Sequence, residues 1–154
     1  MLSALKELFE TFTHAPGQTP VERAQALQLA TAVLMVEVVR CDGEMGDEER
    51  RTVQHQLHRV LALPGAALPE LIARAEVAAK TAYDYQHFTS TLNDQLTQPQ
   101  KIALVEDLWT VAYADTRLDA NEHHVISKLA SLMYVTHGEY IGAKMRAKEA
   151  AGLT

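Results

Sequence analysis

The sequence predicts an all-α fold, a single-domain bundle of about seven or eight helices with an internal pseudo-twofold duplication. Apolar residues recur at helical spacing in almost every long segment, and no segment keeps the alternation of a strand. The linkers are short, so residues 1–154 are expected to form one domain. With 154 residues and 47% hydrophobic composition, the chain is long enough to bury a core without disulfides. A fixed-offset repeat supplies the third observation.

Start and stop signals divide the first half of the chain into helices. Thr19 can cap a helix with Pro20 at its first position, and the run Leu63-Pro64-Gly65 ends a later one. The helix that begins at Pro20 becomes apolar on nearly all sides, which predicts a central, buried second half. The expected helices in this half cover residues 2–11, 20 to about 41, 47 to about 61, and 68 to about 83.

The second half is divided in the same way. A helix passes through Tyr85, Phe88 and Leu92, and Thr97 and Pro99 introduce the next one. The expected helices then cover residues 99–114, 119 to about 134, and 137 to about 150.

Two stretches repeat at an offset of 73 residues: MVEVVRCDGEMGDEE over residues 35–49 and LWTVAYADTRLDANE over residues 108–122. Asp42 aligns with Asp115, and Glu49 aligns with Glu122. Each copy has an apolar helix, an acidic loop and a second helix, so the halves cover about 20–62 and 98–135. This predicts two helix–loop–helix units about a pseudo-twofold axis, with their apolar helices in contact.

The segments RCDGEMGDEE and LWTVAYADTRLDANEHHVI resemble the TerB-like family of tellurite-resistance-associated helical domains. The resemblance extends from about Pro20 to Lys148 and includes YDYQHFTSTLND between the halves. It implies an all-helical domain in a stress- or tellurite-resistance-related context, with a candidate acidic site and no agreed biochemical activity. The loops depart from a shared pattern, because Gly46 stands where the second has Asp119, and Thr116 where the first has Gly43.

The acidic loops are candidate divalent-cation sites. Five carboxylates fall between Asp42 and Glu49, and Ca²⁺ or Mg²⁺ prefers such oxygen ligands, which suits these ions better than Zn²⁺. The span of eight residues is too short for an EF-hand loop, which needs about twelve. The expected metal ligands are Asp42, Glu44 and Glu49, with Asp115, Asp119 and Glu122 as a weaker second set.

A structural role for the same residues is the alternative. Asp119-Ala-Asn-Glu122 has the form of a capping box, and the stretch from Gly46 to Glu49 is its weaker copy. Acidic residues also interact favourably with the positive end of a helix dipole. In this interpretation the domain is a protein-interaction or scaffold module whose acidic loops are helix caps and bind no metal.

Other functions find less support in the sequence. Common catalytic motifs are absent, Cys41 precedes a run of carboxylates that disfavours its thiolate, and the domain is expected not to be an enzyme. Glu37 lies within an apolar helix and needs a partner, for which Arg40 and Tyr113 are candidates. The net charge of −6 argues against nucleic acid, and a protein partner or a homodimer stays open.

Targeting signals are also absent from the sequence. The first twelve residues carry acidic side chains and no cleavage site typical of a signal peptide. The most apolar stretch, residues 29–39, is far shorter than the ~20 residues that cross a bilayer. A cytoplasmic domain with no direct membrane insertion is therefore expected.

Overall fold

The computed structural model describes residues 19–40, 45–81, 85–114 and 120–153, and for residues 120–122 the backbone alone. Over these residues the chain forms seven α-helices and one short 3₁₀ helix, with no strand, which confirms the all-α prediction. The elements are α2 (Pro20–Val39), α3 (Asp47–Leu61), η1 (Gly65–Ala67), α4 (Leu68–Thr81), α5 (Gln86–Gln95), α6 (Gln98–Ala114), α7 (Ala120–Leu132) and α8 (His137–Ala150). The helix expected over residues 2–11 lies outside the described residues.

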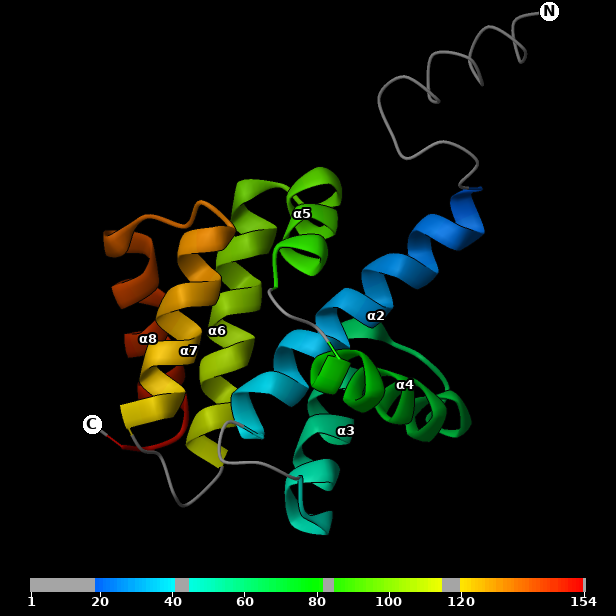
Figure 1. Ribbon diagram of the computed structural model, residues 1–154. Helices are drawn as coiled ribbons and strands as arrows, with labels where there is room; N and C mark the ends of the chain where they lie inside the picture. The colour runs from blue at the N-terminus through cyan, green and yellow to red at the C-terminus, as the bar shows by residue number, and fades with distance from the viewer. Residues whose placement is uncertain (1–18, 41–44, 82–84, 115–119, 154) are drawn as a thin grey trace, which may run out of the picture.

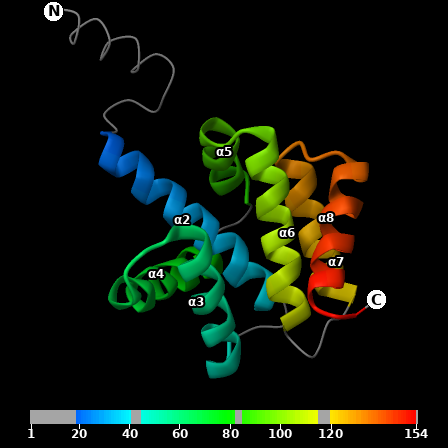
Figure 2. The same cartoon turned by 180° about the vertical axis from the view of Figure 1, so that it is seen from behind.

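Helix α2 occupies the centre of the molecule. It crosses between α3 and α4 on one side and the group formed by α5, α6, α7 and α8 on the other (Figure 1). The same arrangement is visible from behind, where the start of α2 projects beyond the other helices (Figure 2). This position agrees with the sequence pattern, because a helix that is apolar on all sides has to be covered on all sides.

The start of α2 follows its local signals. The Thr19 hydroxyl accepts a hydrogen bond of 3.1 Å from the backbone N–H of Glu22, and Pro20 occupies the first turn, where no N–H is needed. The first turns are mostly exposed, whereas every residue from Ala30 to Val39 is buried. Helix α2 is therefore anchored by its C-terminal half.

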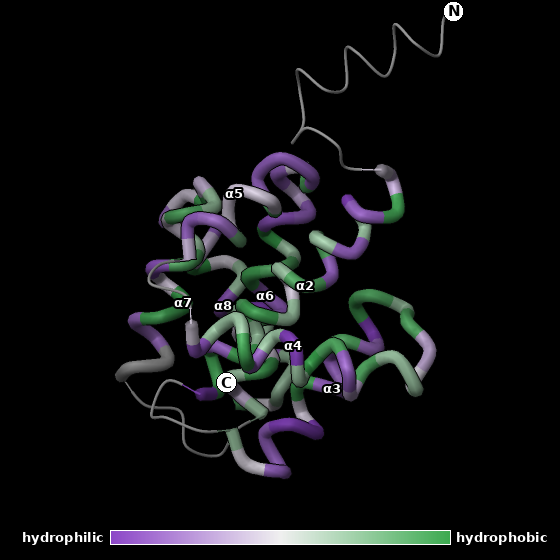
Figure 3. The backbone as a smooth tube through the Cα atoms, turned by 45° about the vertical axis from the view of Figure 1, so that its right-hand side comes forward, coloured by the Kyte–Doolittle hydropathy of each residue, from purple (hydrophilic) through white to green (hydrophobic). Residues whose placement is uncertain are grey.

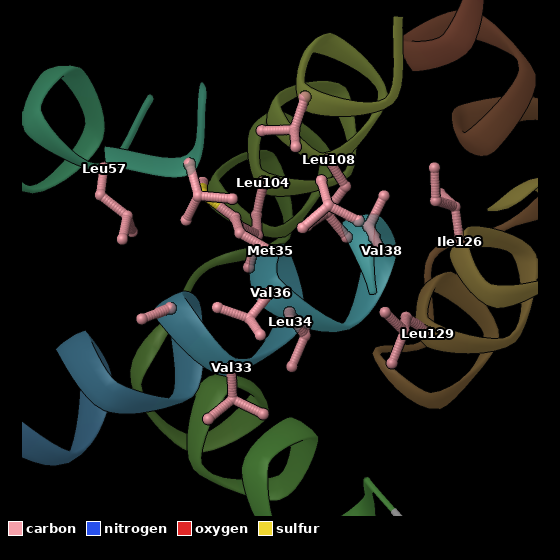
Figure 4. Close-up of a cluster of buried hydrophobic side chains, with 14 of the residues drawn as sticks. Val33, Leu34, Met35, Val36, Val38, Leu57, Leu104, Leu108, Ile126 and Leu129 are labelled. Atoms are coloured by element: carbon pink, nitrogen blue, oxygen red, sulfur yellow. The ribbon is translucent and has the colours of Figure 1, made fainter. Parts of the chain in front are cut away.

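The core forms around this buried half. Side chains of α3, α6 and α7 surround it in Figure 4, where Leu57, Leu104 and Ile126 each belong to a different helix. Interlocking aliphatic side chains of this kind supply most of the stability of a helical domain, at about 25 cal/mol per Å² of apolar surface removed from water. In Figure 3, by contrast, much of α3 is hydrophilic, in keeping with its single buried face.

The two apolar helices of the predicted repeat, α2 and α6, pack against each other. Each is followed by a helix that also contacts it, α3 after α2 and α7 after α6. These contacts agree with the expected helix–loop–helix units, while the pseudo-twofold relation between the halves stays a prediction. Among the helices of the described segments, none combines the length and apolar character needed to cross a membrane.

Candidate functional site

Helices α2 and α6 end side by side. Both views place the last turn of α2, at Val39, near the last turn of α6, at Ala114 (Figures 1 and 2). The backbone N–H of Arg40 donates to the carbonyl of Val36 at 3.0 Å and closes α2. In the sequence, each of these ends leads directly into one of the two acidic segments, so the segments are attached at neighbouring points of the fold.

The structure describes few of the predicted metal ligands. Asp42, Glu44, Asp115 and Asp119 lie outside the described residues. Glu122 falls on α7, where the backbone alone is described, and Glu49 lies in the first turn of α3. Across the described segments, no three His, Cys, Asp or Glu side chains are grouped in a way that could hold a metal ion.

Glu49 has a capping interaction. One of its carboxylate oxygens, Oε2, accepts a hydrogen bond of 3.3 Å from the backbone N–H of Gly46, the N-cap residue of α3. This is one half of a capping box, and the other half is missing because glycine has no side chain to return the bond. Nearby, Asp47 forms an ion pair of 3.2 Å with Arg50. Both carboxylates thus have structural partners.

Arg50 also links α3 to α4. Its Nη2 and Nε donate to the same Glu76 oxygen at 2.7 and 3.0 Å. The hydrogen bond to Glu76 is the main cause that raises the pKa of the Arg50 guanidinium. Arg50 therefore partly balances the negative charge at the start of its own helix.

The carboxylate of Glu37 has Arg40 as its partner. The Nη1 atom of Arg40 lies 2.9 Å from Glu37 Oε2, so the first of the two predicted partners is confirmed. Tyr113, the second candidate, stacks on Trp109 with ring centroids 5.5 Å apart, and burial raises the pKa of its hydroxyl. The Nε atom of Arg40 is buried without a hydrogen-bond partner among the described residues.

The half-buried carboxylate of Asp107 is not among the residues predicted from the sequence. It accepts a hydrogen bond of 3.0 Å from Gln56 Nε2, which joins α6 to α3. Burial raises the pKa of Asp107 to about 6, against the lowering effect of the Gln56 hydrogen bond. Asp107 lies in the apolar run of residues 102–114, and this position could have identified it from the sequence. A carboxylate in an apolar helix needs a partner, as Glu37 does.

The only tryptophan lies in an aromatic cluster between α6, α7 and α8. The fully buried Trp109 ring packs edge-on against His123 at 4.9 Å between centroids, and Tyr140 tilts against it at 5.8 Å. The Nζ atom of Lys144 lies 5.1 Å from the centroid of the Trp109 ring. This cluster explains how the C-terminal helix is held against α6.

Comparison with known proteins gives one match. The family model described as "Tellurite resistance protein TerB" matches residues 28–145, a range that includes most of α2 and extends into α8. No curated protein and no solved structure matches the chain significantly.

Proposed function

The chain belongs to the TerB family, and on this basis we propose that it acts by binding rather than by catalysis, with a divalent cation held by the acidic segments that follow α2 and α6. One observation carries the proposal: the two helices pack together and end side by side. The first acidic segment contributes Asp42 and Glu44, which follow the end of α2 within a few residues. The second contributes Asp115, the residue directly after α6. Ca²⁺ and Mg²⁺ bind through oxygen donors, and the carboxylates of both segments can supply them.

The electrostatics of the helix ends support the same location. A helix C-terminus carries a partial negative charge, which favours a cation. The last turn of α6 has no basic residue, and Arg40, the C-cap residue of α2, is paired with Glu37 at 2.9 Å. The N-terminus of α3 carries the opposite partial charge and disfavours a cation. We therefore assign the main ligand roles to Asp42, Glu44 and Asp115, the residues nearest to the C-terminal ends, and weaker roles to Glu49, Asp119 and Glu122.

Calorimetric titration of the full chain with Ca²⁺, Mg²⁺, Mn²⁺ and Zn²⁺ tests this proposal, with thermal unfolding as a second readout. We expect binding heat and a raised melting temperature with Ca²⁺ or Mg²⁺, and at least tenfold weaker binding for Asp42→Asn and Asp115→Asn. Glu70→Gln removes an exposed carboxylate from the start of α4 and should leave binding unchanged. No heat and no thermal shift with any of the four ions at millimolar concentration would refute the proposal.

The capping contact of Glu49 favours a second candidate, an interaction domain that binds no ion. Glu49 caps the start of α3 and Asp47 is paired with Arg50, so both carboxylates have structural roles that require no metal. In that case the acidic segments attract a basic partner by long-range electrostatics. A lysine-rich probe peptide should then bind with an affinity that falls with salt and is the same with and without a chelator. Loss of peptide binding on addition of the chelator would exclude this candidate.

A further inference from the structure

A surface groove lies between α3 and α6. Its volume is about 590 Å³, and its walls are formed by one face of α3 and by the C-terminal turns of α6. Glu48, at one end of the lining, belongs to the first acidic segment, and the remaining lining residues lie outside both segments. The groove is lined by Glu48, Arg51, Thr52, His55, Gln56, Arg59, Thr110, Val111 and Ala114.

The α3 wall carries a row of basic side chains. Arg51, His55 and Arg59 are exposed and follow one another at intervals of four residues, so they share a helix face. Four residues of α-helix rise about 6 Å, and the row therefore extends about 12 Å. Among the described residues, no carboxylate forms an ion pair with Arg51 or Arg59.

Two carboxylates lie near the row, and neither forms an ion pair with it among the described residues. Glu48 lies at the N-terminal end of the groove, one turn before Arg51. The Asp107 carboxylate is half-buried and accepts its hydrogen bond from Gln56, and it also interacts electrostatically with Arg59 without forming an ion pair. Arg51 uses its Nε for a 3.4 Å hydrogen bond to the backbone carbonyl of Asp47, a contact that does not neutralise it.

The α6 wall is uncharged and has small side chains. Thr110, Val111 and Ala114 line this side, and the Thr110 hydroxyl is already bonded to the carbonyl of Glu106 at 3.0 Å. Small residues let the backbone of a second helix approach closely. The groove thus has a basic wall, which attracts negative charge, and an uncharged wall without long side chains, against which a helix can pack.

We propose that this groove binds an acidic helical segment of a partner protein, one with Asp or Glu at every fourth position along one face. Such carboxylates are also about 6 Å apart, so each can meet one member of the row formed by Arg51, His55 and Arg59. The open shape of the groove suits a helix lying along it, and the bidentate geometry of the two guanidinium groups suits carboxylates. Because the chain as a whole carries −6, net charge does not drive this attraction.

Two fluorescent alanine-rich peptides of equal composition provide the test. In one, three Glu residues stand four positions apart on one face, and in the other they stand five positions apart and spread around the helix. With the full-length chain at low salt, we expect at least fivefold tighter binding of the first peptide. Equal affinity for both peptides, or binding of neither, would overturn the proposal, as would displacement of the first peptide by a few millimolar inorganic phosphate.

Variants of the groove residues distinguish binding in the groove from nonspecific attraction between charges. Arg51→Gln with Arg59→Gln should weaken the matched peptide at least tenfold, whereas Arg74→Gln, at an exposed arginine of α4 outside the groove, should change it less than twofold. Arg51→Glu with Arg59→Glu should bind a peptide with Lys in place of Glu at the same spacing. All variants alter exposed side chains, and circular dichroism checks that they fold. Equal losses in the Arg74 variant would show that no specific groove is involved.

Discussion

Gln56 Nε2 donates a hydrogen bond of 3.0 Å to the Oδ1 atom of Asp107, and this bond joins α3 to α6. Gln56 is buried, and Asp107 is half-buried. The side-chain amide of Gln56 gives the carboxylate a hydrogen-bond donor, but it carries no positive charge to offset the negative charge of Asp107. As a result burial prevails, and the pKa of Asp107 is raised to about 6.

The pH dependence of stability follows from this shift. Between about pH 4 and pH 6 the folded state keeps the Asp107 proton that the unfolded state, with a carboxyl pKa near 3.9, has lost. The contribution of this group to stability therefore falls as the pH rises through that window and stays at its lowest value above it. Asp107→Asn removes the effect and keeps an oxygen for Gln56 to bond, so the variant should be more stable above pH 6, by about 1 kcal/mol after allowance for solvent screening.

Urea unfolding of the wild type and of Asp107→Asn, measured from pH 3.5 to pH 8, checks this prediction. The two free energies of unfolding should differ above pH 6 and converge near pH 4. Asp94→Asn, at an exposed carboxylate of α5, is the control and should give a nearly constant difference over the same range. A variant that is less stable than the wild type at pH 7 would contradict the argument.

The ion pair between Glu37 and Arg40 gives a second prediction. The exposed fractions of the side chains are 10% for Glu37 and 17% for Arg40, so removing one leaves a nearly buried charge. Arg40→Ala should lower the free energy of unfolding by about 2 kcal/mol, less than for a fully buried pair. The double variant Glu37→Met with Arg40→Met should remain within about 1 kcal/mol of the wild type, because it removes both charges.

Urea unfolding of the single and double variants tests this difference. If the double variant is as unstable as Arg40→Ala, the cost lies in lost packing and not in the unpaired charge of Glu37.

Local sequence signals were sufficient to predict most of the fold. Thr19 and Pro20 marked the start of α2, and the predicted ranges of α3 and α8 agree with the structure. The fourth helix is described from Leu68 to Thr81, and its predicted end near Tyr83 lies outside the described residues. The apolar pattern of α2 and α6 also predicted that these two helices would meet.

Contacts between distant segments could not be predicted in this way. Gln56 and Asp107 are 51 residues apart, and nothing in the sequence near either residue indicates the other. The four-residue spacing of Arg51, His55 and Arg59 is contained in the sequence, but the neutral wall opposite them depends on how α6 packs. Of the expected metal ligands, Glu49 alone has a described side chain, and its contact is a helix cap, so the cation site stays a prediction.

Lys144 above Trp109 leads to a third prediction. The ammonium lies 5.1 Å from the ring centroid and 3.5 Å from His123 Nδ1, in a partly buried position where a cation–π contact is strengthened. Lys144→Met keeps most of the aliphatic stem and removes the charge, and should destabilise the domain by about 1 kcal/mol. Lys148→Met, one turn further along α8, should cost less than about 0.5 kcal/mol.

Unfolding is measured by tryptophan fluorescence. Trp109 is the only tryptophan, so the emission reports directly on the environment of this cluster. The emission maximum of folded Lys144→Met should stay in the range of a buried indole. A red-shifted maximum in the native state would mean that the variant opens the cluster, and the loss in stability could then not be assigned to the cation–π contact.

The incomplete cap of α3 leads to the last prediction. Gly46 has an extended conformation, with φ −78° and ψ 173°, and a Cβ atom added there would meet nothing within 4 Å. In the complete capping box of α8, by contrast, the Thr136 hydroxyl accepts a 3.2 Å hydrogen bond from the backbone N–H of Glu139. Gly46→Ser should supply the missing acceptor and restrict the unfolded chain, raising the free energy of unfolding by about 0.5–1 kcal/mol.

Thr136→Ala is the matched reverse change and should lower the free energy of unfolding by about 1 kcal/mol. Both variants are to be measured by urea unfolding in excess chelator, so that any bound cation does not contribute. A stabilised Gly46→Ser means that the start of α3 acts as a helix terminus on its own. If Gly46→Ser is destabilised in chelator, the conformation at this position is set by something other than the cap, and the structural role assigned to Glu49 is wrong.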